Sequence, residues 1–330
     1  MSIVKVLRLS ALITAGLLLG LLFKGCDASQ APLQPKTLII GMDGVQLQRY
    51  EELGDETNLQ RLFYGKAYAG GVTGRASEQA TDSGPGWITL LTGVWANKHG
   101  VTSNAESLRV NPQFPSLFKR LRHALPNAYL ASVVNWSPIN TAFLLEDAQG
   151  NNVRESGLSD EQVTARTLDI LEHTPADFTF IQLDEPVEAG HTSGFGSAYL
   201  FALREADDRL GRLLDKVEAR AYKNPQEDWL VIVCSSDGSD YQDSSHGEVT
   251  EQEKTALIAS NKPWNEEWIR PGSADDTPRH GSAALTSVAP TVLRHMGLDL
   301  LPQWELDGTP LPVVSGARNA RATGGDAKAR

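Results

Sequence analysis

Thr37-Leu38-Ile39-Ile40-Gly41-Met42-Asp43-Gly44 is an apolar run that closes on an aspartate and a glycine. Such a run is typical of a buried strand, and Asp43 stands at its carboxyl end. Open α/β sheets build their functional sites at the carboxyl ends of their strands. We therefore expect Asp43 to belong to a functional site.

Three further apolar runs have the length of strands, and helical patterns separate them. These runs are Tyr129 to Val134, Phe178 to Leu183 and Leu230 to Ser235. The helices are expected at Ala198 to Val217, Asp160 to His173 and Ser287 to Met296. This alternation predicts an α/β fold with a doubly wound, mainly parallel sheet and helices on both faces. The polar segment 102–154 predicts a small loop or cap insertion over the site.

Length and composition suit one folded domain. The chain has 330 residues with 41% hydrophobic content, which is enough to bury a large core. We expect a folded domain over residues 37–314 and a disordered tail over 315–330, which is rich in Gly, Ala, Arg and Lys. The net charge of −11 argues against nucleic acid as a partner, because polyanion binding selects a basic face.

Residues 1–36 differ from the rest of the chain. Lys5 and Arg8 precede an uncharged apolar run from Leu9 to Phe23, and a polar spacer follows. This pattern predicts a signal peptide or an N-terminal membrane anchor, with Cys26 as an alternative lipid-attachment site. We therefore expect an extracytoplasmic protein, periplasmic or secreted, with a membrane tether as one alternative. The other cysteine, Cys234, lies in an apolar run and is expected to be an inert core thiol.

The turn Thr81-Asp82-Ser83-Gly84-Pro85-Gly86-Trp87 places a hydroxyl where a helix begins. Pro85 is favoured near that end of a helix, because the proline N–H is missing where it would lack a partner. The backbone N–H groups and the dipole of a helix start attract a phosphate or sulfate oxygen. Ser83 is therefore a candidate nucleophile, although an ordinary helix-capping serine has the same pattern.

Three more segments end strands with oxygen or imidazole ligands. They are 180–191 (FIQLDEPVEAGH), 231–238 (VIVCSSDG) and 245–248 (SHGE). With these blocks the chain resembles the alkaline phosphatase superfamily, and most closely its type I phosphodiesterase/nucleotide pyrophosphatase branch. The resemblance extends from about Thr37 to Leu311 and includes 287–293 (SVAPTVL) and 306–311 (LDGTPL).

The resemblance implies a hydrolase of small phosphoric esters that uses two divalent metal ions, zinc above all. Asp43 would bind the first ion, Ser83 would be the nucleophile on it and form a phospho-enzyme, and Asp237 would be a further ligand. His191 and a later histidine would bind the second ion, with His246 as first choice and His280 as the alternative.

Two positions depart from the family pattern. The family has Asp-x-Pro-Asp-x-x-Gly-His, but Val187 replaces the second aspartate, which is a ligand. The family also has Ser-Asp-His-Gly, but Gly238 replaces the histidine. Each ion therefore loses one expected ligand, and zinc normally needs four. A non-catalytic relative that binds a ligand or partner is the competing interpretation.

Other roles follow from position. Trp87 and Asn135 are candidate substrate-binding residues, since Asn135 follows the strand that ends at Val134. A sulfatase interpretation is weaker, because sulfatases carry Cys/Ser-x-Pro-x-Arg and Trp87 stands where the arginine is required. His99, in Lys98-His99-Gly100, is expected to close a helix rather than to bind metal.

Overall fold

The structure, a computed structural model, describes residues 32–238, 250, 253–264 and 283–312. Contacts divide the chain into residues 1–34 and 35–330, and the described helices and strands belong to the second unit, with β1 starting at its border. Residues 1–31 of the expected export segment, His246, His280 and the expected tail lie outside the described residues, whereas residues 34–36, expected to be part of the spacer, begin the first strand. No helix in the described part has the length and hydrophobicity needed to span a membrane.

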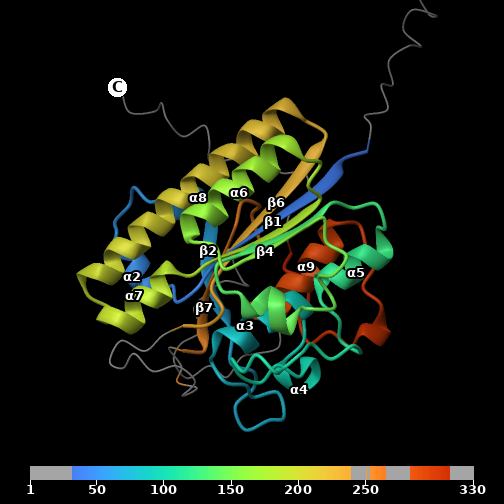
Figure 1. The fold of residues 1–330 in the computed structure, drawn as a ribbon, viewed down its shortest axis with the longest axis horizontal. Helices are drawn as coiled ribbons and strands as arrows, with labels where there is room; N and C mark the ends of the chain where they lie inside the picture. Colours follow the sequence, from blue (N-terminus) through green and yellow to red (C-terminus); the bar gives the residue numbers. More distant parts are fainter. Residues whose placement is uncertain (1–31, 239–249, 251–252, 265–282, 313–330) are drawn as a thin grey trace, which may run out of the picture. The chain divides into compact units, whose positions relative to one another are not determined.

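A seven-stranded sheet forms the centre of residues 35–330 (Figure 1). Its order is β2-β7-β6-β1-β5-β3-β4, with parallel pairing of β1, β5, β3 and β4 and antiparallel pairing of β7 with both β2 and β6. The strands are β1 Gln34–Met42, β2 Phe63–Tyr68, β3 Leu130–Val134, β4 Val153–Ser156, β5 Phe178–Leu183, β6 Glu227–Cys234 and β7 Thr255–Ser260.

The predicted α/β class and the doubly wound, mainly parallel sheet are confirmed. All four expected strands are present as β1, β3, β5 and β6. β2, β4 and β7 were not expected. β2 and β4 are the two edge strands, and β7 runs against its neighbours.

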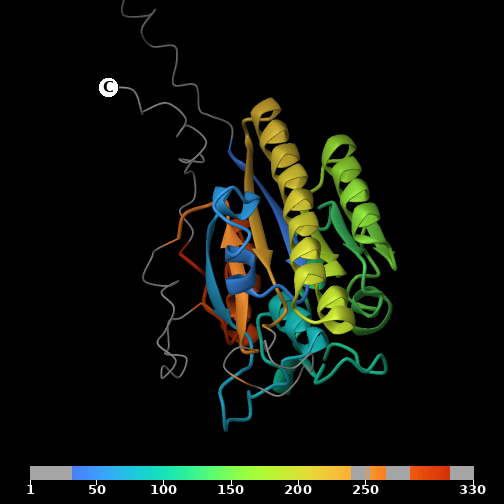
Figure 2. The ribbon, with the colours of Figure 1, turned by 90° about the vertical axis from the view of Figure 1, so that its left-hand side faces the viewer.

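Helices cover both faces of the sheet. On one face α6 and α8 lie side by side, and α2 and α7 contact α8 (Figures 1 and 2). On the other face α3 contacts α4 and α9, and α5 contacts α9. The helices are α2 Leu47–Glu51, α3 Ser83–Thr92, α4 Ala96–His99, α5 Leu117–Ala124, α6 Asp160–His173, α7 Glu185–Ser193, α8 Ser197–Lys223 and α9 Val288–His295. The described residues also form four short helical turns, η1 Asn58–Arg61, η2 Ile139–Phe143, η4 Leu285–Ser287 and η5 Pro302–Trp304.

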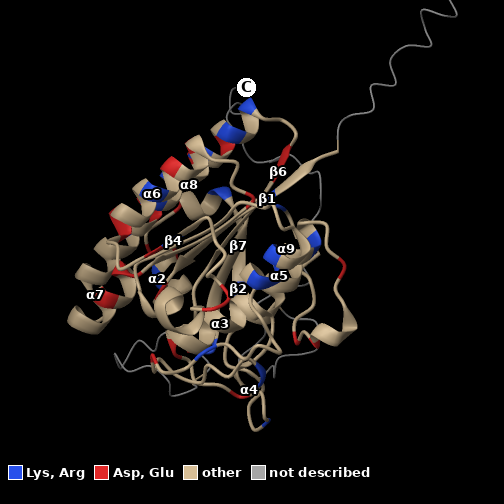
Figure 3. Ribbon diagram, turned by 45° about the vertical axis from the view of Figure 1, so that its right-hand side comes forward, with Lys and Arg blue, Asp and Glu red and all other residues tan. Residues whose placement is uncertain are grey.

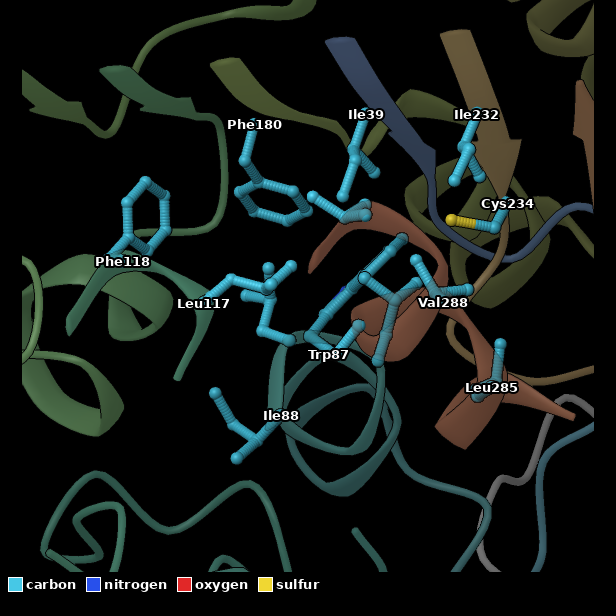
Figure 4. Close-up of a cluster of buried hydrophobic side chains, with 14 of the residues drawn as sticks. Ile39, Trp87, Ile88, Leu117, Phe118, Phe180, Ile232, Cys234, Leu285 and Val288 are labelled. Carbon is cyan, nitrogen blue, oxygen red and sulfur yellow. The ribbon is translucent and has the colours of Figure 1, made fainter. Parts of the chain in front are cut away.

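The two-residue repeat of each strand sends its side chains alternately into two cores. On the α6/α8 face, Leu38 and Ile40 of β1 pack with the buried residues of those helices. On the α3 face, Ile39 packs with Trp87, Phe180 and other residues of the second core (Figure 4). Residues at odd positions of β1 therefore face α3, and this parity carries on to Asp43.

The outer surface of α6 and α8 carries charges of both signs (Figure 3). Arg212 of α8 makes two hydrogen bonds to Glu161 of α6, at 2.8 and 2.6 Å. Lys216 bonds Glu172 at 2.6 Å. Exposed pairs of this kind contribute about 0–1 kcal/mol each, so the apolar cores carry the stability of this layer.

Candidate functional site

The carboxylate of Asp43 is buried and surrounded by hydrogen-bond donors. Asp43 is 1% exposed. Its Oδ1 accepts from Ser236 Oγ at 2.5 Å and from Gly44 N at 3.1 Å. Its Oδ2 accepts from Trp87 Nε1 at 3.0 Å and, at 3.5 Å, from Gln182 Nε2. A carboxylate has about four lone-pair positions, so the acceptor capacity of Asp43 is filled.

The alternation of side chains along each strand explains why these donors meet. Asp43, Gln182 and Ser236 continue the positions of β1, β5 and β6 that face α3. Trp87 reaches Asp43 because Gly41 leaves room: a Cβ on Gly41 would come within 2.6 Å of the Trp87 ring. The ring is fully buried between α3 and the strands and meets Phe180 edge-on, with centroids 6.0 Å apart (Figure 4).

Ser83 is the first residue of α3, as expected. It is half-buried, and no described residue hydrogen-bonds its hydroxyl. The next backbone N–H, that of Gly84, donates to the exposed Asn104 Oδ1 at 2.7 Å. Close packing fixes this helix start, because a Cβ on Gly86 would come 2.2 Å from the carbonyl oxygen of Ser236. The Ser83 hydroxyl therefore stands on a closely packed helix terminus and has no hydrogen bond to a described residue.

Asp237 is as buried as Asp43 but differs from it in its hydrogen bonds. It is 1% exposed, and among the described residues neither of its carboxylate oxygens has a hydrogen-bond partner. Burial above all, followed by the charges of Asp43, Asp82 and Glu253, raises its pKa well above the usual range, and the adjacent Ser236 hydroxyl, which donates to Asp43 Oδ1, acts weakly in the opposite direction. An ionised carboxylate that is buried without partners is costly. The described part of the chain therefore favours the protonated form of Asp237.

A third carboxyl lies beside Asp43. Met42 pairs with Leu183 in the parallel register of β1 and β5, so Asp43 and Asp184 leave the sheet side by side. Gln182 Nε2 donates to Asp184 Oδ1 at 2.7 Å. Burial, and after it the charge of Asp43, raises the pKa of Asp184 to about 7.

At the expected second metal position, Val187 stands where the family pattern has an aspartate, so no carboxylate is present there. This residue is 8% exposed and packs against Gly44, whose φ of 67° and missing Cβ permit the contact. His191, one turn further along α7, is exposed. Gly238 follows Asp237 and has no side-chain donor. The structure therefore brings together Asp43, Asp237 and the α3 terminus but does not show His191 converging with them.

Trp87 and Asn135 occupy structural positions. Trp87 contributes its N–H to Asp43, and its buried ring is not exposed for stacking. Asn135 Nδ2 donates to Asp160 Oδ1 at 2.8 Å. Asp160 in turn accepts from the backbone N–H groups of Asp184 and Glu185, which begin α7. Asn135 thus supports the start of α7.

His99 is a core residue. It is fully buried, its ring nitrogens contact Thr89 Oγ1 at 3.0 Å and Val101 N at 3.1 Å, and burial lowers its pKa to about 3. It is therefore neutral and outside the site.

The described residues do not form the two-ion centre that the resemblance implies. No group of three or more His, Cys, Asp or Glu among them is arranged to hold a metal ion. The oxygens of Asp43 already accept hydrogen bonds, whereas those of Asp237 have no hydrogen-bond partner among the described residues.

Sequence reasoning missed two residues at this edge, Asn104 and Glu253, because neither follows any of the expected strands. It considered Asp184 only as a substitute for the ligand lost at Val187, and the structure places Asp184 beside Asp43 instead.

No family model and no curated protein matches this sequence. Solved structures match its fold at low identity. The alkaline phosphatase from the Antarctic bacterium TAB5 is 14% identical with a TM-score of 0.53, covering 82% of this chain and 100% of that one. A putative sulfatase from Bacteroides thetaiotaomicron VPI-5482 is 13% identical with a TM-score of 0.57, covering 84% and 74%. A 2-O GAG sulfatase is 12% identical with a TM-score of 0.56, covering 84% and 73%.

At such identities the likeness establishes the fold alone, and a shared fold hosts different chemistries. A variant of the TAB5 enzyme was solved with Mg bound in its M3 site, so this fold accommodates divalent cations. The chain therefore has the α/β fold that alkaline phosphatases and sulfatases share.

Proposed function

We propose that this protein is a hydrolase of small phosphoric esters, with Ser83 as nucleophile and one divalent cation at Asp237. The observation that carries the proposal is the buried carboxylate of Asp237, which has no hydrogen-bond partner among the described residues and lies beside the helix start that bears Ser83. The charge of Asp82, which precedes Ser83, acts on Asp237 and indicates that the two segments lie close together. A phosphodiester substrate, as in the nucleotide pyrophosphatase branch, is the class that the sequence motifs favour.

The residues of the chain have separate tasks in this reaction. Ser83 Oγ forms the bond to phosphorus, the bond to the ester oxygen breaks, and the alcohol leaves with a proton. Water then cleaves the phosphoserine. The Gly84 N–H, which Asn104 occupies in the structure, offers a donor to a phosphate oxygen. A cation at Asp237 would supply charge neutralisation and a lower pKa for the serine hydroxyl.

The last residue of the nucleophile turn, Trp87, supports a phosphate ester rather than a sulfate ester as the substrate. The arginine of the sulfatase pattern is replaced by Trp87, and this side chain is committed to Asp43. The sulfatase neighbours are nevertheless as similar in fold as the phosphatase. Sulfate esters therefore belong in the activity test.

The test compares bis(p-nitrophenyl) phosphate, p-nitrophenyl phosphate and p-nitrophenyl sulfate with added Zn²⁺, Mn²⁺ or Mg²⁺. We expect turnover of a phosphate ester, its loss in Ser83→Ala, and a phosphorylated Ser83 peptide in mass spectra of quenched reactions. Turnover of the sulfate ester alone would show that the substrate is a sulfate ester rather than a phosphate ester. No turnover, with less than one equivalent of bound metal, would contradict the proposal.

A second candidate function is a non-catalytic relative that binds a ligand or partner. The filled acceptor positions of Asp43, together with Val187 and Gly238, favour it. The double variant Val187→Asp/Gly238→His separates the two. Raised Zn²⁺ affinity and the appearance of hydrolysis in this variant would indicate a site that has lost activity through these two changes. An active wild-type protein would exclude the second candidate.

We also propose that the protein acts outside the cytoplasm and is held by its N-terminal segment. The support is the basic and apolar pattern of residues 1–36. Fractionation of cells that express the full chain, compared with a chain that starts at residue 35, tests this. Recovery of both forms in the cytoplasm would contradict it.

A further inference from the structure

Glu253 lies at the carboxyl edge of the sheet although it precedes a strand. It stands two residues before β7, which runs antiparallel to β6. The start of β7 therefore lies beside the end of β6, which leads into Asp237. Glu253 is 1% exposed, so its side chain is buried at this edge.

The side chain of Glu253 holds the segment that leads to Ser83. Its Oε2 accepts from Thr81 Oγ1 at 3.3 Å and from the backbone N–H of Thr250 at 3.0 Å. The Glu253 N–H donates back to Thr250 Oγ1 at 3.3 Å, which fixes the orientation of the carboxylate. Thr81 is 1% exposed and stands two residues before Ser83. The hydrogen bond from Thr81 is therefore made in a buried, defined geometry.

The backbone of Glu253 holds the other half of the site. Its carbonyl oxygen accepts from the N–H of Gly238 at 2.7 Å, directly after Asp237. One residue thus contacts both the approach to Ser83 and the segment that carries Asp237.

We propose that Glu253 is a positioning residue that fixes the Thr81–Ser83 turn against the segment that carries Asp237. This inference rests on the proposed function, because it assigns Glu253 a task within that same site. Glu253 itself contacts neither the substrate nor the reacting atoms.

The test removes the hydrogen bond from each of its two sides. Glu253→Ala deletes the acceptor for Thr81, and we expect orthovanadate affinity and kcat both to fall about 10-fold because the serine turn shifts. Glu253→Gln keeps an acceptor for Thr81 and should restore both. The matched control is Glu78→Ala, which deletes a carboxylate that contacts neither Thr81 nor Thr250, and it should leave both unchanged.

Thr81→Val removes the hydroxyl and keeps the shape. We expect this variant to bind Mn²⁺ like the wild type, while orthovanadate binding and kcat both fall about 10-fold because the serine turn shifts. Thr81→Ser should restore both. Unfolding temperatures in EDTA show whether any variant is simply unfolded.

Unchanged vanadate binding in Thr81→Val overturns the positioning assignment. A wild-type protein that binds vanadate but hydrolyses no ester would remove the proposed function, while vanadate binding by Thr81→Val still decides the role of Glu253. A wild-type protein that binds no vanadate overturns both.

Discussion

Asp43 follows β1 and Asp237 follows β6, two neighbouring strands of one sheet, and both carboxylates are 1% exposed. Asp43 receives hydrogen bonds from Trp87, Ser236, Gly44 and Gln182. Asp237 receives none from the described residues. The same residue type at the same edge is therefore a satisfied structural anion in one place and an unsatisfied group in the other. Hydrogen-bond supply, rather than strand position, decides which of the two is available to a cation.

The largest expected effect comes from removing the satisfied carboxylate. Asp43→Ala leaves the buried donors of Trp87, Ser236 and Gly44 without an acceptor, and each such group costs about 1–3 kcal/mol. We expect the free energy of unfolding to fall by about 3–5 kcal/mol. Urea denaturation in metal-free buffer measures this change. Asp43→Asn keeps one acceptor and should lose less, and a loss below about 1 kcal/mol in Asp43→Ala would show that these hydrogen bonds contribute little.

A smaller loss is expected when one donor is removed. Trp87→Phe keeps most of the ring packing and deletes the N–H bonded to Asp43 Oδ2. A hydrogen bond to a charged group is worth about 1.5–3 kcal/mol, and we expect a loss in that range from the midpoint of urea denaturation. Trp95→Phe is the control, because the indole N–H of Trp95 has no hydrogen bond to a described residue. Equal losses in the two variants would indicate ring packing as the cause.

Asp237→Asn is expected to stabilise the metal-free protein rather than to destabilise it. The raised pKa of Asp237 contributes stability below the usual carboxyl range, and this stability is lost as the pH rises from that range through the folded pKa. Without metal, the variant should therefore match the wild type most closely at about pH 4 and gain on it progressively at higher pH. Cation affinity should fall about 10-fold or more, since a ligand is lost. Thermal unfolding in EDTA between about pH 4 and pH 9 and calorimetry with Mn²⁺ provide the readouts. A larger loss of affinity in Asp43→Asn would reverse the assignment.

The smallest effect concerns Asp184, whose pKa is raised to about 7 by burial and then by Asp43, Asp160 and Glu188. A raised carboxyl pKa contributes stability that is present below the unfolded value and is lost as the pH rises to about 7. Asp184→Asn should therefore gain stability relative to the wild type at pH 8 and not at pH 4. Chemical denaturation at both pH values tests this. Parallel pH profiles for the two proteins would contradict the assigned pKa.

Much of this architecture could be predicted from the sequence. The strands that end near Asp43, Asp184 and Asp237 are long apolar runs, and a buried run is the strongest local signal of a strand. β7 is equally apolar, but its reversed direction is a tertiary property that no local pattern contains. Glu253 was missed for the same reason, because reading past the carboxyl ends of strands does not reach a residue that precedes one.

The location of the site could be predicted from the sequence, but the hydrogen bonding of its carboxylates could not. The positions of Asp43, Ser83 and Asp237 follow from strand ends and a helix start. The donors to Asp43 come from four separate parts of the chain, and their meeting depends on strand order and on the depth of the α3 packing. A sequence pattern indicates a carboxylate at a strand end but does not show whether donors surround it.

The close approach of Trp87 to Gly41 has an evolutionary consequence. The ring lies where any side chain at position 41 would have to be, because a Cβ at that position would stand only 2.6 Å from it. A lineage cannot acquire tryptophan at position 87 while a larger residue occupies position 41, so the glycine must come first or arrive together with it. In sequence comparisons, the paired presence of Gly41 and Trp87 should therefore identify relatives in which an indole N–H donates to the carboxylate at position 43.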